Sequence, residues 1–503
     1  MITWGISANS HDAALAVFTH GPVAGENLEL QFASHSERYS RIKNDPHLNT
    51  QLIAAAKHWG EPDEIIWYER PLAKSFRQLT AGQGFRFREN NIRNYLGRYG
   101  LHVPITCVNH HLAHAAAGYY TSGFSEATVL CVDSIGEFDT ISIWTAQGKK
   151  LRRIHAQGYP HSLGLWYSAI TQRVGLKPQE DEYILMGMAA YGDPYRLFLD
   201  VLNDFFYPME NSAVRELLDL CPTIKLRHNL HRGCSWWRPD LNTVQDMFDI
   251  AAAAQAVYQY LLKCISNWAR QHSPSGNLVF MGGCALNCAA NSTLSKDWNS
   301  VWIMPNPGDA GSSIGSVLAH YSQPIRWPGP YLGHNIEGEY PIDRILHKLK
   351  TEGICGVASG RAEFGPRALG HRSLLADPRG AEIKQRVNAI KQRQQFRPFA
   401  PAILAEHVGD YFEGSTGPYM QFTARCRFPE LYPAIVHSDG TSRVQTVGRE
   451  DRTDFRSLLE KWYEETGCPM LLNTSLNIKG QPMVNTAEDA QQFAEHYGVS
   501  VFC

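Results

Sequence analysis

The sequence has almost no surplus of either charge, since 47 lysines and arginines stand against 49 aspartates and glutamates among 503 residues. This balance excludes a protein that holds nucleic acid or membranes by bulk charge, although local basic patches remain open. No run of about 18 apolar residues occurs, so we predict no membrane span. The first residues carry no basic leader and contain His11 and Asp12, which is untypical of a secretory signal. We therefore expect a cytoplasmic protein.

The sequence also lacks cysteine spacing typical of disulfide frameworks. Its 11 cysteines are an odd number scattered along the chain, and only Cys284 and Cys288 stand close together, which predicts reduced thiols. We find no GxxxxGK[ST] phosphate loop, low-complexity segment or short tandem repeat. The remaining composition, 44% apolar and 19% charged, is typical of a globular protein with several domains.

A strand, polar turn, strand pattern occurs twice in the first third of the sequence. Residues 2–6 and 13–18 read as strands around the turn 7–12, and residues 127–133 and 140–145 repeat this arrangement. The pattern resembles the actin-like ATPase and sugar-kinase superfamily, in which paired hairpin turns face the phosphates of a nucleotide. We predict an α/β fold with a duplicated N-terminal domain of this type.

A break in composition divides the chain. Before it, helical periodicity covers 244–270, a buried strand covers 277–281, and a helix is expected to follow from Ala285. The segment 323–340 is rich in proline and glycine and reads as a linker. Strands at 354–358 and 470–473, a helix at 455–465 and a capped helix at 486–497 follow. We predict one domain over 1–330 and a smaller α/β domain over 341–503.

Two histidines and two aspartates form the first candidate site. His110 and His114 are spaced i, i+4 in an alanine-rich helical segment, so they share one face and can meet one metal ion. With 21 histidines, about one such pair is expected by chance. Asp133 and Asp309 each follow an apolar run, where a carboxylate is poorly placed for packing. The four residues would suit iron, manganese or zinc.

Two glycine-rich turns follow predicted strands. Gly282 and Gly283 come after 277–281, and Gly308 begins a second turn that leads into 311–315. Glycines permit close approach of a ligand to the backbone, and a following helix offers a positive N-terminus. The pair favours a nucleotide cleft, although each alone could be an ordinary turn.

Positive charge is concentrated in the second domain. Arginines and lysines between 361 and 397 alternate with Gly, Pro and Phe, which favours loops around an anion over a solvated charged face. Asn473 and Ser475 end a strand nearby. The basic residues are Arg361, Arg367, Arg372, Arg379, Lys391, Arg393 and Arg397.

Three further features leave alternatives open. His11, in the first turn, could act as a general base or be a loop histidine bonded to a carbonyl. The segments 85–100 and 224–239 interleave basic and aromatic residues. They could stack bases and contact phosphates, or be a surface helix and a buried Trp pair.

Blocks of sequence over nearly the whole chain resemble the NodU/CmcH carbamoyltransferase family. They are NSHDAALAV, VNHHLAHAAAGYY, VDSIGEFDT, EDEYILMGMAAYG, MGGCALNCAAN, PNPGDAGSSIG, GRAEFGPRALGHRSLLADPR, FRPFAPAIL, HSDGTSRVQTV and LLNTSLNIKGQP. The family joins a domain similar to tRNA threonylcarbamoyl transferases to a YrdC-like domain. Two departures stand out: Leu476 replaces a usual Phe, and DEYIL lacks a Gly-Lys pair that many members have.

The resemblance implies a reaction in two stages. The C-terminal domain would convert carbamoyl phosphate and ATP into carbamoyl-adenylate, and the N-terminal domain would transfer the carbamoyl group to an acceptor hydroxyl. His11 matches the base. A divalent metal, Fe²⁺ with Mn²⁺ or Mg²⁺ as alternatives, would bind His110, His114, Asp133 and Asp309. Nucleotide contacts match Gly282, Gly283, Asn287 and Gly308, and carbamoyl phosphate or ATP contacts match Arg367, Lys391, Arg443, Asn473 and Ser475.

The acceptor stays open at this stage. The basic–aromatic segments favour a hydroxymethylated pyrimidine nucleotide or nucleic acid, and the alternative is a sugar or antibiotic-type natural product. Threonylcarbamoylation of tRNA fits the GPRALG and NTSLN blocks less well. A non-catalytic ATP-binding scaffold fits His11 and the four metal positions less well. A homodimer also remains open.

Overall fold

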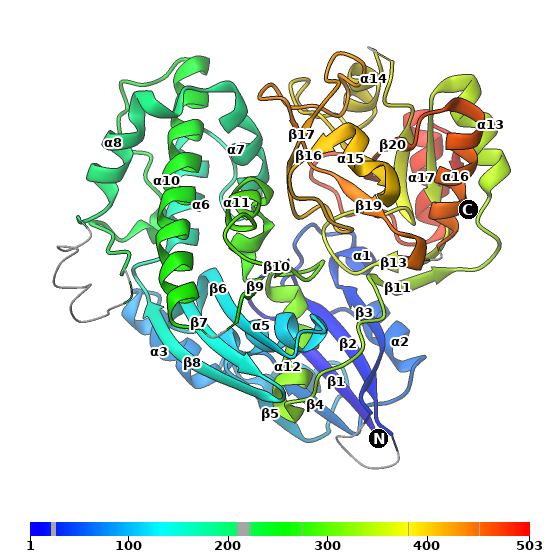
Figure 1. The fold of residues 1–503 in the computed structure, drawn as a ribbon. Coiled ribbons are helices and arrows are strands. Elements are labelled where there is room, and N and C mark those ends of the chain that lie inside the picture. Colours follow the sequence, from blue (N-terminus) through cyan, green and yellow to red (C-terminus); the bar gives the residue numbers. More distant parts are fainter. Residues whose placement is uncertain (22–26, 209–220, 222, 274, 381, 452) are drawn as a thin grey trace. The chain divides into compact units, whose positions relative to one another are not determined.

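The chain forms two compact units in a computed structural model that describes residues 1–21, 27–208, 221, 223–273, 275–380, 382–451 and 453–503 (Figure 1). The first unit contains Met1–Gln31 and Ala56–Trp327, and the second contains Phe32–Ala55 and Pro328–Cys503. We call Phe32–Ala55 the N-terminal arm. The second unit is therefore built from two separate stretches of sequence. The expected assignment of 1–330 to transfer and 341–503 to activation stays a prediction.

Two five-stranded sheets of the same topology lie in the first unit, except that residues 32–35, at the end of one strand, belong to the second unit. One has the order β3-β2-β1-β4-β5 and the other, read from its β8 edge, β8-β7-β6-β9-β10, so each reads third, second, first, fourth, fifth. In both, the first strand pairs antiparallel with the second and parallel with the fourth. The repetition confirms the predicted duplicated α/β fold. The strands are β1 (Ile2–Ser7), β2 (Ala14–Thr19), β3 (Glu29–His35), β4 (Glu64–Trp67), β5 (Ile105–Cys107), β6 (Glu126–Gly136), β7 (Asp139–Gln147), β8 (Lys150–Gly158), β9 (Asn277–Met281) and β10 (Ser300–Trp302).

Two helices lie between these sheets. Helix α5 (His110–Thr121) packs on β6, α12 (Ser312–Tyr321) packs on β1, and the two helices contact each other. Gly315 allows this contact, because a Cβ there would lie 1.9 Å from the carbonyl oxygen of Ala113. The alanines of α5 are buried, which explains why this segment is so rich in small side chains. The two helix N-termini bring distant parts of the chain together.

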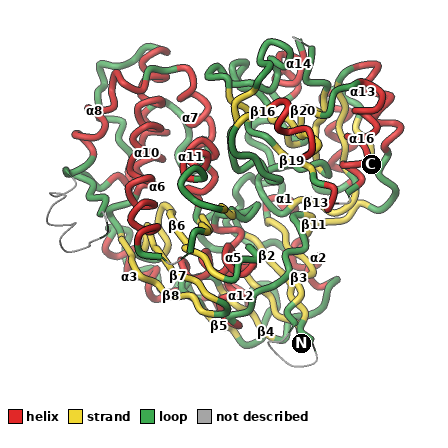
Figure 2. The backbone as a smooth tube through the Cα atoms, viewed as in Figure 1, coloured by secondary structure: helices red, strands yellow, loops and turns green. Residues whose placement is uncertain are grey.

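The predicted long helix is α10 (Val244–Gln271), which begins with a capping box of Thr243 and Asp246. It packs against α6 (Leu163–Arg173), α7 (Glu182–Met188), α8 (Pro194–Phe205) and α11 (Cys288–Leu294) (Figures 1 and 2). The helix expected from Ala285 starts later. A 3-10 turn, Gly283–Leu286, comes first, and the Asn287 side chain then caps α11. The remaining helices of this unit include α3 (Pro71–Thr80) and α4 (Ile92–Gly97).

The second unit is built on a six-stranded mixed sheet of order β19-β15-β20-β14-β12-β21. Its strands are β12 (Ile354–Ala358), β14 (Arg372–Ala376), β15 (Ala400–Leu404), β19 (Gln445–Val447), β20 (Met470–Ser475) and β21 (Val501–Phe502). Buried apolar clusters join this sheet to α13 (Ile342–Glu352), α14 (Ile383–Ile390), α16 (Asp454–Thr466) and α17 (Ala487–Tyr497). The predicted strand at 354–358 and the Thr486/Asp489 cap of α17 are confirmed.

Two of the predicted absences can be compared with the structure. Among the described residues, no helix is both long enough and apolar enough to cross a membrane. None of the 11 cysteines, all of which lie among the described residues, forms a disulfide, and seven of them are buried.

Candidate functional site

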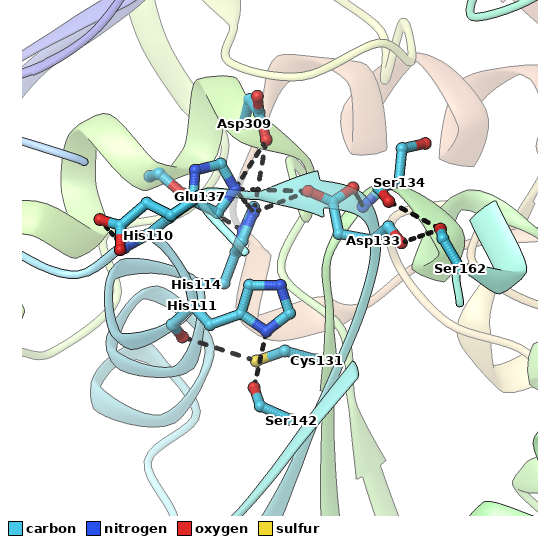
Figure 3. A network of polar contacts seen from close by, with 12 residues as sticks. His110, His111, His114, Cys131, Asp133, Ser134, Glu137, Ser142, Ser162 and Asp309 are labelled. Carbon is cyan, nitrogen blue, oxygen red and sulfur yellow. Dashed lines mark hydrogen bonds and ion pairs between the residues drawn. The ribbon is translucent and has the colours of Figure 1, made fainter. Parts of the chain in front are cut away.

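Two histidines and two aspartates converge in the first unit, with their ligand atoms all within 4.8 Å of one another. The Nε2 atoms of His110 and His114 are 3.1 Å apart, and His110 Nε2 lies 3.3 Å from both Asp133 Oδ2 and Asp309 Oδ1. His114 Nε2 lies 3.6 and 3.4 Å from the same two oxygens. Figure 3 shows the four side chains pointing toward one another. The structure thus brings together all four of the predicted metal ligands.

Three separate elements supply this cluster. The histidines occupy the first turns of α5, whose start is fixed by the Asn109 side chain accepting the N–H of Leu112. Asp133 lies in β6, which pairs with β9 in the same sheet. Asp309 begins a 3-10 turn directly before α12. The contact between α5 and α12 is therefore what places Asp309 against the histidines.

Electrostatics in the cluster favour paired charges. Burial lowers the pKa of His110, but Asp309 and Asp133 outweigh burial and raise that pKa well above its ordinary value. Burial opposes ionisation of Asp309 as well, yet the neighbouring His110 lowers the pKa of its carboxyl to about 2. Two imidazole nitrogens and two carboxylate oxygens around one point are the donor set of a borderline or hard divalent ion. The residues present therefore fit a metal ion.

A second layer of polar side chains holds the ligands. Ser312 Oγ lies 3.2 Å from His114 Nδ1, and Gly283 N donates to Asp133 Oδ1 at 3.2 Å. Ligand histidines in metal sites commonly have such partners on their second nitrogen. The glycine turn predicted for the nucleotide thus also orients a candidate metal ligand.

Glu137 is a site residue that sequence reasoning missed. Its buried carboxylate accepts the backbone N–H of Arg70 at 2.7 Å, the Arg70 guanidinium at 2.6 Å and the Asn109 amide at 3.0 Å. Gly136 beside it leaves room for the His110 ring, because a Cβ would lie 2.2 Å from His110 Cδ2. Glu137 and Arg70 are 67 residues apart, so no local pattern marks the pair.

The predicted glycines lie directly at this cluster. Gly282 has φ +90°, and a Cβ there would lie 2.2 Å from the carbonyl oxygen of Val132. Gly308 faces Gly283, since a Cβ on Gly308 would lie 3.9 Å from the Gly283 Cα. Asn287 is different. Its side-chain amide exchanges two hydrogen bonds with Gln255, at 2.9 and 3.0 Å, and caps α11, so its polar atoms are already used by the protein.

His11 lies half-exposed in the turn between β1 and β2. Asn9 in this turn has φ +65°, and Lys74 holds it by donating to the Asn9 carbonyl at 2.8 Å. Lys74 is buried and ion-paired with Glu69 at 2.6 Å. Tyr68 connects the turn to the cluster, because its N–H donates to Ile6 at the end of β1 and its ring lies 5.2 Å from the His110 ring.

Lys391 anchors the second predicted site, in the second unit. Its buried Nζ lies 3.2 Å from Ser475 Oγ and 3.0 Å from Asn477 Oδ1, and it also contacts both backbone carbonyls. Burial lowers the pKa of Lys391 well below its usual range, and Arg393 and Arg397 lower it further. Lys391 and Ser475, both predicted for the phosphate site, thus lie in contact, and Lys391 holds the end of β20.

The loop that carries Arg367 is fastened to the same strand end. Asn473 donates to the carbonyl of Ala368 at 3.2 Å, next to Arg367. The buried Glu363 accepts the N–H groups of Leu369 at 2.7 Å and His371 at 2.9 Å. This loop is thus held from both sides.

Arg443 belongs to the same positive neighbourhood. Burial lowers the pKa of His437 to about 4, the nearby Asp439 opposes this, and Arg443 and Arg397 reinforce it. Since Arg397 acts on both Lys391 and His437, the predicted cations Lys391 and Arg443 share one electrostatic environment. A buried lysine with half-buried arginines near it favours an anionic ligand.

The comparisons with known proteins agree with this picture of two functional halves. A family model described as Carbamoyltransferase N-terminus matches residues 68–318, and one described as Carbamoyltransferase C-terminus matches residues 346–503. The chain belongs to the carbamoyltransferase family, and the predicted NodU/CmcH-type membership is confirmed. It is accordingly an enzyme of carbamoyl transfer.

Its relatives are of several kinds. The chain is 33% identical to uncharacterized protein sll1178 of Synechocystis sp., over 97% of this chain and 93% of that protein. It is 31% identical to nodulation protein NolO of Bradyrhizobium diazoefficiens, over 76% of this chain and 75% of that protein. It is 27% identical to 3'-hydroxymethylcephem-O-carbamoyltransferase of Amycolatopsis lactamdurans, over 97% of this chain and 96% of that protein.

Among solved structures, full-length HypF in its phosphate- and nucleotide-bound form has a TM-score of 0.36 at 14% identity, covering 64% of this chain and 46% of that chain. A likeness this remote carries no functional argument.

Proposed function

We propose that this carbamoyltransferase uses ATP and transfers its group through carbamoyl-adenylate to an acceptor hydroxyl. The observation that carries the proposal is the pair of chemically different sites. The second unit gathers half-buried arginines around the buried Lys391, and the first unit joins a His/Asp cluster to two glycine turns. An activation step on phosphates and a transfer step with a nucleotide leaving group need these two environments.

Activation belongs to the second unit in this proposal. Lys391, Arg367 and Arg443 would neutralise phosphate oxygens of carbamoyl phosphate and ATP. Hydrolysis of carbamoyl phosphate releases phosphate and leaves carbamate. A carbamate oxygen then bonds to the α-phosphorus of ATP, and the bond to pyrophosphate breaks. Asn473 and Ser475 would position these substrates. Exclusion of water matters here, because carbamate decomposes in water.

Transfer belongs to the first unit. His110, His114, Asp133 and Asp309 would hold a divalent ion, Fe²⁺ in the first instance with Mn²⁺ or Mg²⁺ as alternatives. Such an ion supplies positive charge near the phosphate of the AMP leaving group. A ring nitrogen of His11 takes the proton of the acceptor hydroxyl as the acceptor oxygen bonds to the carbamoyl carbon. The bond from that carbon to the AMP oxygen then breaks.

For the acceptor we propose a hydroxymethylated pyrimidine nucleotide, free or within nucleic acid. Exposed arginines and phenylalanines in segment 85–100 support it, since stacking and phosphate contact are the chemistry of nucleotide binding. The name of the Amycolatopsis relative specifies a hydroxymethyl group as acceptor. A sugar or antibiotic-type natural product is the second candidate, and that cephem relative favours it equally at the level of chemistry.

The test uses the purified full chain with Fe²⁺, carbamoyl phosphate and ATP. Release of pyrophosphate is expected before any acceptor is added. Incubation with 5-hydroxymethylcytosine DNA, 5-hydroxymethyl-dCMP or an aminoglycoside should then add about 43 Da to the true acceptor. His11→Ala should keep pyrophosphate release and lose transfer, whereas the exposed His102→Ala should keep both. No pyrophosphate release would refute the ATP proposal. Threonylcarbamoyl adenosine in tRNA would favour that other reaction.

A further inference from the structure

An exposed aromatic ridge lies on the first unit, outside the residues assigned to the reaction. We define the ridge as Phe76, Phe85 and Phe87, which are 49%, 50% and 42% exposed. The Phe76 and Phe85 rings lie 5.3 Å apart, and the Phe85 and Phe87 rings lie 6.1 Å apart and 14° from parallel. Large rings exposed side by side are costly in water and commonly mark a binding surface.

The ridge is built by one helix and the segment that follows it. Leu72, Phe76 and Leu79 are spaced i, i+4, i+7 along α3, so they share its exposed face. Asn90 fastens the following segment to this helix by donating to Ser75 Oγ at 2.9 Å and to Gln78 Oε1 at 2.8 Å. The segment that carries Phe85 and Phe87 is therefore fixed to α3 by side-chain hydrogen bonds.

The opposite side of the same helix holds the turn of the proposed base. Lys74, buried on that side, donates to the Asn9 carbonyl at 2.8 Å, two residues before His11. The Asn9 side chain in turn donates to the carbonyl of Glu89 at 3.2 Å, two residues beyond Phe87. Both ends of the ridge are thus tied by hydrogen bonds to the His11 turn. The segment that carries Phe85 and Phe87 is therefore joined directly to the turn that carries the proposed base.

The charge around the ridge indicates what the acceptor carries. Arg86, Arg88 and Arg93 are exposed in this segment, and Glu89 is the acidic residue among them. Arg86 donates to the Gln83 carbonyl at 3.0 Å and pairs loosely with Glu89 at 3.5 Å. Stacking rings beside a surplus of guanidinium groups fit a planar ring that bears an anionic group.

The second basic–aromatic segment meets the first. Gln83 Nε2, two residues before the first segment, lies 2.8 Å from His231 Nε2 in the second segment. In that second segment Trp237 is buried and Trp236 is 52% exposed, so the expected buried Trp pair holds for only one of the two. The ridge residues, by contrast, point their rings to solvent.

We infer that the ridge docks the acceptor, and that it recognises a planar ring together with a phosphate, as in a nucleotide that is free or part of a strand. This inference rests on the proposed transfer function and deepens it by naming the acceptor surface. Sequence-tolerant stacking of one base is worth about 1–3 kcal/mol, or roughly 5- to 150-fold in affinity. Removing two of the three rings should therefore be measurable in binding alone.

The first experiment measures binding of 5-hydroxymethyl-dCMP, and of a short single strand containing 5-hydroxymethylcytosine, to the full chain by calorimetry. We expect the double variant Phe85→Ala/Phe87→Ala to weaken binding at least about 10-fold. Tyr195→Ala is the matched control, because Tyr195 is an 89% exposed ring elsewhere in the first unit. Tighter binding of the strand than of the mononucleotide would identify nucleic acid as the source.

The second experiment tests the anionic part. The nucleoside without phosphate should bind more weakly than the nucleotide, and Arg88→Gln should abolish that difference. Arg98→Gln, at another exposed arginine, should leave the difference intact. Unchanged nucleotide binding in the double phenylalanine variant would overturn the inference. So would a wild-type dimer that the same variant converts to monomer in light scattering, since the ridge would then be a self-association surface.

Acceptor-free pyrophosphate release separates this inference from the proposed function. If the wild type releases pyrophosphate but binds neither probe, the ridge assignment fails and the activation proposal stands. If the wild type binds both probes through the ridge but releases no pyrophosphate, the activation proposal fails and the ridge assignment stands. The double variant should release pyrophosphate at the wild-type rate and show a raised KM for the acceptor with little change in kcat, which a general loss of structure would not produce.

Discussion

At the residue scale, the cluster in the first unit is made from charges that need one another. His110 and His114 are buried between Asp133 and Asp309, and none of the four could be buried in ionised form alone at low cost. Burial opposes the charged forms, yet the carboxylates raise the pKa of both imidazoles, and His110 and His114 lower the pKa of Asp133. A divalent ion would supply positive charge to balance the two carboxylates.

The first prediction concerns metal content. Asp309→Asn removes one negative oxygen at the ligand position while keeping the size of the side chain, so we expect affinity for Fe²⁺ to fall by more than about 100-fold. Metal analysis after desalting would show this loss, with the far-ultraviolet circular dichroism unchanged. His102→Gln, at an exposed histidine of the same unit, serves as control. Full metal content in Asp309→Asn would contradict the assignment.

The second prediction concerns pH and the second unit. Because the pKa of His437 is about 4 in the folded protein and about 6.5 when unfolded, only the unfolded state takes up this proton between these values. The unfolding free energy should therefore fall as pH drops from 6.5 to 4, by up to about 3 kcal/mol from this residue. In His437→Asn the unfolding free energy should depend less on pH between 6.5 and 4. Urea titrations at pH 7 and pH 5 would measure the unfolding free energy of the wild type and of His437→Asn. An equal change in unfolding free energy between the two pH values in both proteins would contradict the prediction.

At the scale of elements, the site depends on close backbone contacts more than on side chains. The α5–α12 contact needs Gly315, and the β9 turn needs Gly282 against β6. Where the local pattern alone determines an element, sequence reasoning succeeded, as for β12, α10 and the Thr486 cap of α17. It also found the four cluster residues, because helical spacing and strand ends are local signals.

What sequence reasoning missed is non-local in each case. Glu137 meets Arg70 across 67 residues, and no periodicity records such a pairing. The start of α11 was misplaced because Asn287, through its bonds with Gln255 on α10, caps the helix two residues after Ala285. Tertiary contacts determined both features, and a single sequence does not display them.

The third prediction tests one of these close contacts. Gly282→Ala meets both a left-handed φ and a carbonyl oxygen at 2.2 Å, so we expect destabilisation of about 2–4 kcal/mol. Gly123→Ala shares the positive φ, at +74°, but has open space, so about 1–2 kcal/mol is expected. Denaturant unfolding of the first unit compares them. Equal losses would show that the close contact to Val132 is unimportant.

At the scale of the whole molecule, the N-terminal arm makes the second unit discontinuous in sequence. Arg41 of the arm donates to the carbonyls of Met483 at 2.6 Å and Pro482 at 3.2 Å. Arg38, fully buried, donates to the carbonyl of Gly365 at 3.2 Å, in the loop that carries Arg367. Residues more than 300 positions apart thus support the proposed phosphate site.

The fourth prediction follows from Arg38. Arg38→Met keeps most of the side-chain volume but leaves buried carbonyls without their donor, at a cost of about 1–3 kcal/mol for each. Hydrogen exchange should then quicken in 363–370 while the first unit keeps its protection. Arg98→Met, at an exposed arginine, should change neither. Faster exchange throughout both units, or unchanged exchange at 363–370, would contradict a local role of Arg38.

The arm also dictates an order of events during synthesis. Roughly 270 residues separate its last residue, Ala55, from Pro328, where the rest of the second unit begins. At about 5–20 residues per second, a ribosome needs on the order of 15–50 s to cover that distance. Throughout this interval the arm has emerged and its partners do not yet exist. The second unit is therefore completed only after Pro328–Cys503 has been made, when its strands meet a segment synthesised roughly 270 residues earlier.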